Sequence, residues 1–413
     1  MKKTDFGFNY KILVITVFAS FLIFGFSENI RGPAIARIQA DFSLTGTQLG
    51  VLLATNSFGY LLACFYTASL SRKIGLKRAL IIGLAGMAAS GVGICFSAGY
   101  IMLVACYFAM YLGNGMLEIT LGLIAAETFT KRTGTMLNLS HFFYGLSSTV
   151  APMLSAGLMG VKLGTGALGW RYMYLIVLSL ALLPIIPALM GRIPRKTDGK
   201  RRADAAAFLK NPTSWLIFLI LSFGVACELG VGSWLVNLLE KRLYYTESAA
   251  ALALTGFFVC FTLSRLVIGP LTDRIGYAKS LIIFTAFSGA AITAGILLGR
   301  GGVAPLIAAG FGIAPVYPTV MALVAKLYAK QIDAAMTVTL TIMGVVVVIC
   351  NMFMGALADF FERLFRGFME GNVVGTAYAA AYLFLGFCAL AACVSAAGLF
   401  RRLRRTGEAA RVG

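Results

Sequence analysis

The sequence predicts an all-α membrane protein with twelve transmembrane helices, and three observations lead to this fold class. Of the 413 residues, 59% are hydrophobic and only 12% are charged, far more apolar surface than one water-soluble core requires. Apolar runs of roughly 18 to 25 residues recur along the chain, each long enough to cross a hydrocarbon layer about 30 Å thick as a helix. An internal repeat divides these runs into two equal sets.

The predicted spans follow one another closely, except at one place. In order they cover residues 11–30, 47–70, 79–98, 101–127, 137–159, 170–190, 212–239, 248–271, 280–299, 303–328, 334–358 and 377–400. The exception is a basic, polar segment flanked by helix-ending prolines. We therefore expect an N-terminal six-helix bundle (1–190), a cytoplasmic central loop (191–211) and a C-terminal six-helix bundle with a basic cytoplasmic tail (212–413).

One further helix is expected outside the spans. Residues 359–372, DFFERLFRGFMEGN, alternate aromatic and charged side chains at helical spacing. This pattern predicts a short helix that lies on the outer membrane surface.

The repeat is clearest in the loop after each half's second span. SRKIGLKRALII at residues 71–82 matches TDRIGYAKSLII at residues 272–283. A second pair keeps nearly the same offset, with Gly113-Asn114-Gly115 in the fourth span and Gly310-Phe311-Gly312 in the tenth. The two halves are therefore duplicates of one six-helix unit.

The net charge of +19 is a topology signal. When both termini are placed in the cytoplasm, most Lys and Arg residues fall on that side, including the clusters at 192–202 and 401–405. No aromatic-studded basic segment of the kind that binds nucleic acid accompanies them. We therefore expect a multi-pass protein of the cytoplasmic (inner) membrane with both termini cytoplasmic, and no nucleic-acid partner.

These features carry a family resemblance. Two sets of six spans, a basic central loop and Asp273-Arg274-Ile275-Gly276 after the eighth span resemble the major facilitator superfamily. Arg72 stands where most members carry the Asp of this motif in the first half. That departure is similar to the fucose/glucose/galactose:proton symporter branch, in which the first-half loop reads as a small residue, Lys, any residue and Gly.

More specific matches to that branch run along essentially the whole chain. They are Phe58-Gly59-Tyr60, Leu117-Glu118, Leu137-Asn138-Leu139, Glu228 and Tyr317-Pro318-Thr319. The resemblance implies two bundles related by pseudo-two-fold symmetry. It also implies proton-coupled symport of a neutral monosaccharide or similar polyol by alternating access.

Three carboxylates stand out among the predicted spans: Glu28, Glu118 and Glu228. An ionised carboxylate at the centre of a spanning helix costs about 2.5 to 3.5 kcal/mol on insertion scales, so it is normally tolerated only beside a cavity or a partner. Removal from water disfavours the charged form, which lets such a group load and release a proton as its surroundings alternate between wet and dry. We expect these three residues to couple proton and substrate movement.

Glu118 is the strongest of the three candidates. It lies mid-span and shares a helical face with Asn114 and Tyr111. In the resembling symporters the Glu of this motif couples proton binding to sugar binding. The alternative is a structural carboxyl group held by the backbone or by a neighbouring Arg.

The first span leaves a choice between two adjacent residues. When Pro33 is aligned to the branch pattern, the family's first-span carboxylate falls on Asn29 and not on Glu28. Because one residue turns a helix by about 100°, either Glu28 has taken over this role or Asn29 holds the substrate. Pairing of Glu28 with Arg31 is the third reading, and Glu228 occupies the corresponding place in the seventh span.

Further polar residues lie at helical spacing on the faces of other spans, where their donors, acceptors and flat rings suit a sugar. His141 is the only histidine of the chain, and an ordinary helix contact is an equal alternative for it. Trp234 lies about 120° off the face carrying Glu228, so an interfacial anchor role competes equally with a site role. The expected substrate-binding residues are Asn29, Asn114, Glu118, Asn138, His141, Tyr144, Glu228, Trp234, Asn237, Tyr317 and Asn351.

A last group of charges lies at the cytoplasmic ends of the spans. These residues resemble superfamily gate motifs and would pair in the outward-facing state and separate on opening. They are Glu127, Arg132, Arg265, Asp273 and Arg274.

Two other functions compete with proton-coupled sugar uptake: a drug or metabolite exporter working as a proton antiporter, and a sodium-coupled sugar transporter. Against the exporter, the fifth span lacks the glycine doublet that resembling antiporters carry after their proline, here Pro152. The sequence has no phosphate-binding Gly-x-x-x-x-Gly-Lys loop and no paired metal ligands. We therefore expect no enzymatic activity, no cofactor and no metal site, and a monomer.

Overall fold

The computed structural model describes residues 3–128, 133–163, 166–193, 209–328 and 332–407. Twelve helical segments in this described part are long and apolar enough to cross a membrane. The first half contains α1 (Lys3–Asn29), α2 (Arg31–Asp41), α3 (Gly46–Ile74), α4 (Leu76–Cys95), α5 (Tyr100–Thr128), α6 (Thr133–Gly160), α7 (Gly169–Ser179), η1 (Leu180–Leu182) and α8 (Ile185–Met190). The second contains α10 (Pro212–Leu243), α11 (Glu247–Ile275), α12 (Tyr277–Leu297), η2 (Gly299–Gly302), α13 (Val303–Ile313), α14 (Val316–Leu327), α15 (Ile332–Arg366) and α16 (Val373–Arg405). The predicted all-α fold class is confirmed.

The chain divides into two compact units. Unit 1 comprises Met1–Ser43 and Thr55–Gly199, and unit 2 comprises Leu44–Ala54 and Lys200–Gly413. The helix α3 therefore starts in unit 2 and continues in unit 1. Its first turn is held by Asp359 of α15, whose two carboxylate oxygens accept the backbone N–H groups of Gly46 and Thr47 at 2.6 and 2.7 Å.

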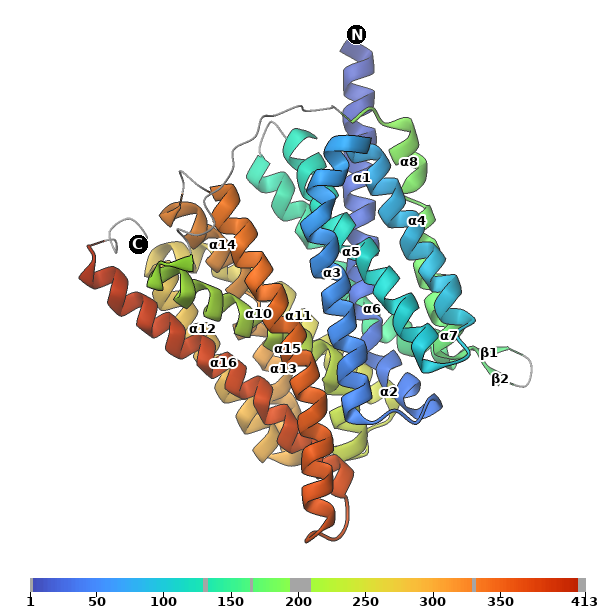
Figure 1. The fold of residues 1–413 in the computed structure, drawn as a ribbon, viewed down its shortest axis with the longest axis vertical. Helices are drawn as coiled ribbons and strands as arrows, with labels where there is room; N and C mark the ends of the chain where they lie inside the picture. Colours follow the sequence, from blue (N-terminus) through green and yellow to red (C-terminus); the bar gives the residue numbers. More distant parts are fainter. Residues whose placement is uncertain (1–2, 129–132, 164–165, 194–208, 329–331, 408–413) are drawn as a thin grey trace. The chain divides into compact units, whose positions relative to one another are not determined.

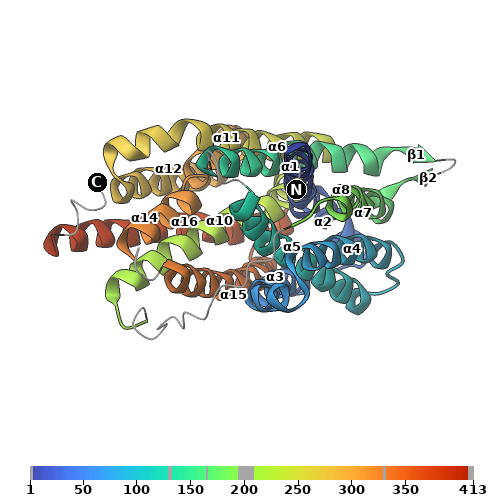
Figure 2. The ribbon, with the colours of Figure 1, turned by 90° about the horizontal axis from the view of Figure 1, so that it is seen from above.

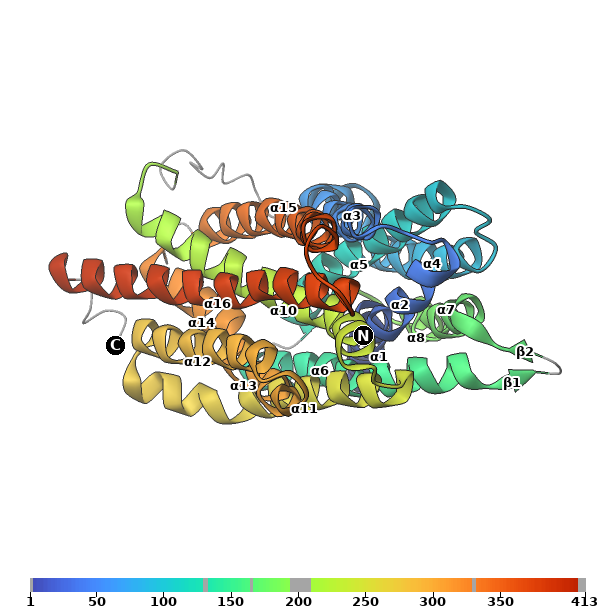
Figure 3. The same cartoon turned by 90° about the horizontal axis from the view of Figure 1, so that it is seen from below.

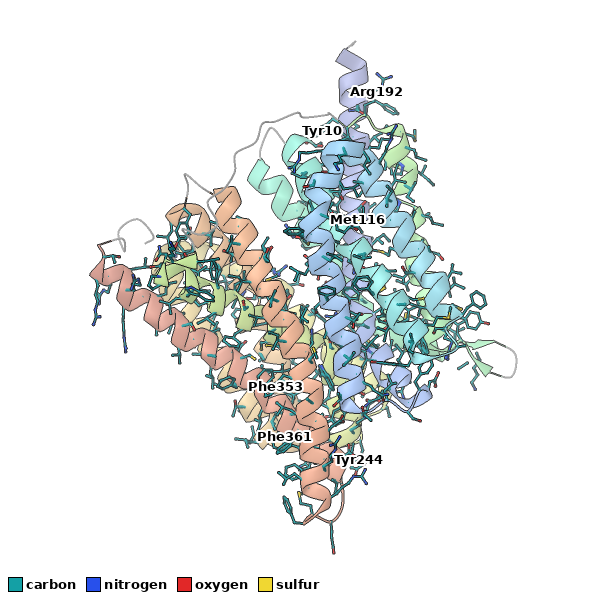
Figure 4. The ribbon with its side chains drawn as sticks, viewed as in Figure 1. Tyr10, Met116, Arg192, Tyr244, Phe353 and Phe361 are labelled. Carbon is teal, nitrogen blue, oxygen red and sulfur yellow. The ribbon has the colours of Figure 1, made fainter. Side chains whose placement is uncertain are left out.

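In unit 1 the helices pack in pairs, with α4 against α5 and α7, and α1 against α5 and α6 (Figures 1 and 2). Glycines allow the closest approaches. A Cβ added to Gly25 of α1 would lie 2.5 Å from the carbonyl oxygen of Tyr144 on α6. At one end of the unit, near Tyr10 and Arg192 in Figure 4, the Asn9 side chain accepts from the Arg192 N–H at 2.7 Å and donates to its carbonyl at 3.1 Å.

In unit 2 the long helix α16 packs along α10 and α12 (Figure 3). Small residues again make room for large ones, since a Cβ added to Gly230 of α10 would lie 2.4 Å from Leu385 of α16. The core consists largely of Leu, Ile, Phe and Ala side chains, as expected where dispersion contacts and close backbone packing associate helices in lipid.

Two predicted spans, 170–190 and 303–328, are interrupted, and α1 ends where the first predicted span ends, with α2 following at once. The breaks lie at Ile30, around Leu183 and at Ala314–Pro315. Each precedes a proline by three or four residues, namely Pro33, Pro187 and Pro318. A proline inside a helix removes a hydrogen bond to the carbonyl four residues earlier and clashes with that carbonyl. The first of these breaks lies beside the candidate site.

The predicted surface helix at residues 359–372 is wrong as a separate element. Residues up to Arg366 continue α15 as a single helix, and Phe353 and Phe361 lie on this one ribbon in Figure 4. Successive aromatic rings stack along the extension, with Phe361 and Phe365 centroids 5.6 Å apart. A small hairpin, in which β1 (Lys162–Leu163) pairs with β2 (Gly166–Ala167), was not predicted.

Candidate functional site

A buried polar cluster lies in unit 1 where α1 ends and α2 begins. Glu28, Asn29 and Arg31 are 7%, 8% and 6% exposed, although all three lie inside a segment long and apolar enough to span a membrane. Glu28 and Asn29 are the last two residues of α1, and because one residue turns a helix by about 100°, their side chains reach different neighbouring helices.

Glu28 is directed toward α5. Its Oε1 atom accepts a hydrogen bond of 2.9 Å from the side-chain amide of Asn114, which is fully buried. The other end of that amide, Oδ1, accepts from the Ser27 hydroxyl at 2.9 Å. Ser27 Oγ also lies 2.8 Å from the carbonyl oxygen of Phe24. Four groups thus lie in a row at hydrogen-bonding distances, and the single Ser27 hydroxyl hydrogen has two acceptors within reach.

Arg31 is the functional candidate that sequence reasoning left out of the site. Its Nη1 atom donates to the Tyr111 hydroxyl at 2.6 Å and lies 3.7 Å from Glu28 Oε2. The second distance exceeds a hydrogen bond, so Arg31 and Glu28 form an electrostatic pair. A cation inside a span, three residues after an acid, is the sequence signal that pointed to this pairing.

Asn29 is directed toward α6. Its amide donates to the Ser148 hydroxyl at 2.9 Å and to the Gly25 carbonyl at 2.9 Å. Tyr144 and His141 belong to the same helix contact, because their rings pack against Phe24 and Phe21 with centroids 5.2 and 5.1 Å apart. Tyr144 is half-buried and His141 is exposed.

Glu118 lies four residues after Asn114 on α5, about 6 Å further along the helix axis and on the same face. Its side chain is half-buried, in contrast to Glu28. The neighbouring turn is held to α3 by Cys64, whose thiol donates to the Gly115 carbonyl at 3.8 Å. Glu28 and Glu118 therefore lie in different surroundings: Glu28 is inside a hydrogen-bonded network, and Glu118 is more exposed.

The candidates of unit 2 lie on three elements. Glu228 on α10 and Tyr317 on α14 are half-buried, whereas Asn351 on α15 is buried. Trp234 and Asn237 are buried on α10, and the Trp234 ring packs against Tyr378 of α16 at a centroid distance of 5.9 Å.

Of the expected gate residues, Arg132 lies outside the described residues. Glu127 and Asp273 belong to the described helices α5 and α11, but their side chains do not belong to the described part, and the same holds for Asn138 on α6. Arg265 is half-buried with its guanidinium 4.4 Å from the centroid of the Phe261 ring, and Arg274 is exposed.

Comparison with known proteins decides the family. Residues 17–246 and 231–412 both match the Major Facilitator Superfamily. The chain belongs to this superfamily. It is therefore a multi-pass integral membrane protein of a transporter family, as the twelve apolar helices of the described part also indicate.

Three relatives are similar over part of their length. A glucose/galactose transporter of Brucella abortus is 26% identical over 254 residues, covering 56% of this chain and 59% of the relative. The protein TsgA homolog of Erwinia tasmaniensis is 24% identical over 58% of this chain and 60% of its own length. Bypass of stop codon protein 6 of Saccharomyces cerevisiae is 21% identical over 64% of this chain and 58% of its own length. The matched region thus spans about three fifths of these relatives.

Solved structures share the fold over nearly the whole chain. A D-xylose-proton symporter aligns with a TM-score of 0.73 at 15% identity, covering 91% of this chain and 96% of the other. The nucleoside transporter NupG aligns with a TM-score of 0.77 at 13% identity, covering 95% and 100%. These likenesses establish the superfamily fold.

Proposed function

We propose that this protein is a secondary active transporter that takes up a neutral monosaccharide or similar polyol together with a proton. The two halves would alternate access to a central site, as inverted or parallel repeats do in such folds. Both termini would face the cytoplasm, and the protein would work as a monomer in the inner membrane.

The observation that carries the proposal is the pair of carboxylates in unit 1. Glu28 is buried and hydrogen-bonded to Asn114, and Glu118 lies one turn beyond Asn114 on the same helix face. An ionised carboxylate in a span is energetically costly and is normally found only beside a cavity or a partner. Uptake of a proton removes its charge before the site loses water. We assign the transported proton to Glu118, because its half-buried side chain is open to exchange, with Glu28 and Glu228 as further coupling groups.

The polar groups around these carboxylates support an uncharged, hydroxylated substrate. Asn29, Asn114 and Tyr144 offer amide and hydroxyl groups that both donate and accept, and Tyr144 adds a ring face. The Brucella abortus relative is a glucose/galactose transporter, which supports this choice. In unit 2 we assign substrate contacts to Tyr317, Asn351 and the α10 residues Trp234 and Asn237.

The proposal is tested in sealed proteoliposomes with an imposed pH gradient, using a panel of labelled hexoses, pentoses, nucleosides and amphiphilic drugs. We expect uphill uptake of a sugar that collapses when a protonophore is added. Uptake that follows a sodium gradient would make the protein a sodium symporter, and drug efflux without sugar uptake would make it an exporter.

The role of Glu118 has its own variant and control. Glu118→Gln keeps the shape and hydrogen-bonding capacity but cannot exchange a proton, so accumulation should be lost while counterflow exchange remains. Glu370→Gln, which neutralises an exposed carboxylate outside the spans, is the matched control and should transport normally. Full accumulation by Glu118→Gln would remove this residue from the mechanism.

A further inference from the structure

The hydrogen-bonded chain around Glu28 contains one more acceptor than a single arrangement uses. The Ser27 hydroxyl has one hydrogen, yet two acceptors lie within reach: Asn114 Oδ1 at 2.9 Å and the Phe24 carbonyl at 2.8 Å. This surplus matters because Asn114 carries a donor and an acceptor on the same planar group.

With Glu28 ionised, the arrangement is fixed. A carboxylate only accepts, so the Asn114 NH₂ group faces Glu28 Oε1 at 2.9 Å. Asn114 Oδ1 then faces Ser27 and accepts its hydroxyl hydrogen. In this state the Phe24 carbonyl receives nothing from Ser27.

With Glu28 protonated, the same heavy-atom positions support a second arrangement. The new O–H needs an acceptor, which the Asn114 amide supplies when it rotates by half a turn and presents Oδ1 to Glu28. The NH₂ group then donates to Ser27 Oγ, and the Ser27 hydroxyl turns to the Phe24 carbonyl. The Glu28, Asn114 and Ser27 side chains are hydrogen-bonded to one another in both states, which avoids the cost of a buried polar group without a partner.

We propose that Asn114 and Ser27 form a two-state amide switch. When Glu28 takes up a proton, the Asn114 amide rotates and the Ser27 hydroxyl changes its acceptor to the Phe24 carbonyl of α1. Asn114 and Ser27 are positioning residues in this scheme, and Glu28 is the group that binds the proton. Amide oxygen and nitrogen are nearly equal in size, so the rotation needs no repacking in a site where Asn114 is fully buried.

Two influences on the charge of Glu28 oppose each other. Arg31 stabilises the ionised form of Glu28 from 3.7 Å, whereas exclusion of water favours the neutral form. Protonation would leave the guanidinium with the Tyr111 hydroxyl as its partner at 2.6 Å. The titratable groups on the elements packed against α1 around this point are Arg31 on α2, Tyr107, Tyr111 and Glu118 on α5, His141 and Tyr144 on α6, and Tyr174 on α7.

The switch deepens the proposed function: its role in transport rests on that function, whereas the rearrangement itself occurs whenever Glu28 takes up a proton. It can therefore be tested without substrate. The assay is an acid-minus-alkaline infrared difference spectrum of the full-length protein in lipid, with asparagine labelled by ¹³C. It is recorded for wild type, Glu28→Gln, Asn114→Leu and the control Glu118→Gln.

Two linked signals are expected from wild type on acidification. A C=O band of a protonated carboxyl group should appear and be lost in Glu28→Gln. A shift of one labelled side-chain amide should accompany it, be lost in both Glu28→Gln and Asn114→Leu, and persist in Glu118→Gln. Should Asn114→Leu fail to fold, the loss of both signals in Glu28→Gln still tests the link.

Two results would overturn the switch. A Glu28 carboxyl band without an amide shift would mean that Asn114 does not rotate. Absence of any Glu28 band at mildly acidic pH would mean that Glu28 is a fixed counter-ion for Arg31. Failure of wild-type protein to accumulate sugar would count against the proposed function and would leave these spectra unaffected.

Discussion

Removing one charge from the Glu28–Arg31 pair should harm the protein far more than removing both. Arg31→Met deletes the cation but leaves a carboxylate that is 7% exposed, and it also removes the donor to Tyr111. Loss of one partner from a buried pair costs about 3 to 5 kcal/mol, whereas replacing both by apolar or neutral groups of similar volume is often nearly neutral. We expect a loss near the lower figure, because the pair is separated by 3.7 Å and shares no hydrogen bond.

The double variant Glu28→Gln/Arg31→Met supplies the decisive comparison. The substituted amide would keep a donor and an acceptor for Asn114, so stability should recover to within about 2 kcal/mol of wild type, a coupling of the size seen between contacting residues. The stability of the two single variants and of the double variant is measured by thermal unfolding of the purified protein. Unfolding is monitored by the reaction of its eight cysteines with a fluorogenic thiol reagent. A double variant as unstable as the sum of the singles would refute the electrostatic reading of this pair.

Three smaller predictions concern the frame that holds the site, and all can be read from the same unfolding assay. Asp359→Ala removes the acceptor for the first two N–H groups of α3 and should lower the free energy of unfolding by about 1 kcal/mol, as loss of a helix cap does. Asp359→Asn should recover part of this loss. An unchanged unfolding midpoint in Asp359→Ala would contradict the capping. Asp41→Ala removes the acceptor of the Trp170 indole at 2.7 Å. Because Asp41 is exposed, the free energy of unfolding should fall by only about 0.5 to 1 kcal/mol. A larger loss would contradict the argument that exposure to water weakens this contact. Gly25→Ala would place a methyl group 2.5 Å from the Tyr144 carbonyl and should cost about 1 to 3 kcal/mol by forcing α1 from α6, so a stable variant would contradict the close packing.

The spans could be predicted well because hydrophobic length and the repeat are local signals. The predicted end of the first span at residue 30 agrees with the end of α1, whereas the breaks inside the sixth and tenth spans were missed because the prolines that cause them, Pro187 and Pro318, lie three or four residues further along the chain. The extension of α15 was misread because alternating aromatic and charged residues suit a surface helix and a protruding helix end equally well.

The candidate site shows the same limit at the level of single residues. Sequence reasoning left a choice between Glu28 and Asn29, whereas the structure gives both a buried partner, Asn114 for one and Ser148 for the other. The choice could not be made earlier because it depends on which neighbouring helix each side chain meets. The sequence indicates Arg31 only as a pairing partner for Glu28, because its contact with the Tyr111 hydroxyl forms only in the folded bundle.

The central claim is that sugar and proton enter together, and one measurement tests it most directly. Proteoliposomes loaded with a pH-sensitive dye, without an imposed gradient, receive the sugar identified in the uptake panel. The account predicts that the lumen acidifies as sugar enters through wild-type protein and that Glu118→Gln gives no acidification. Sugar entry at the same rate with no change in lumenal pH would contradict it.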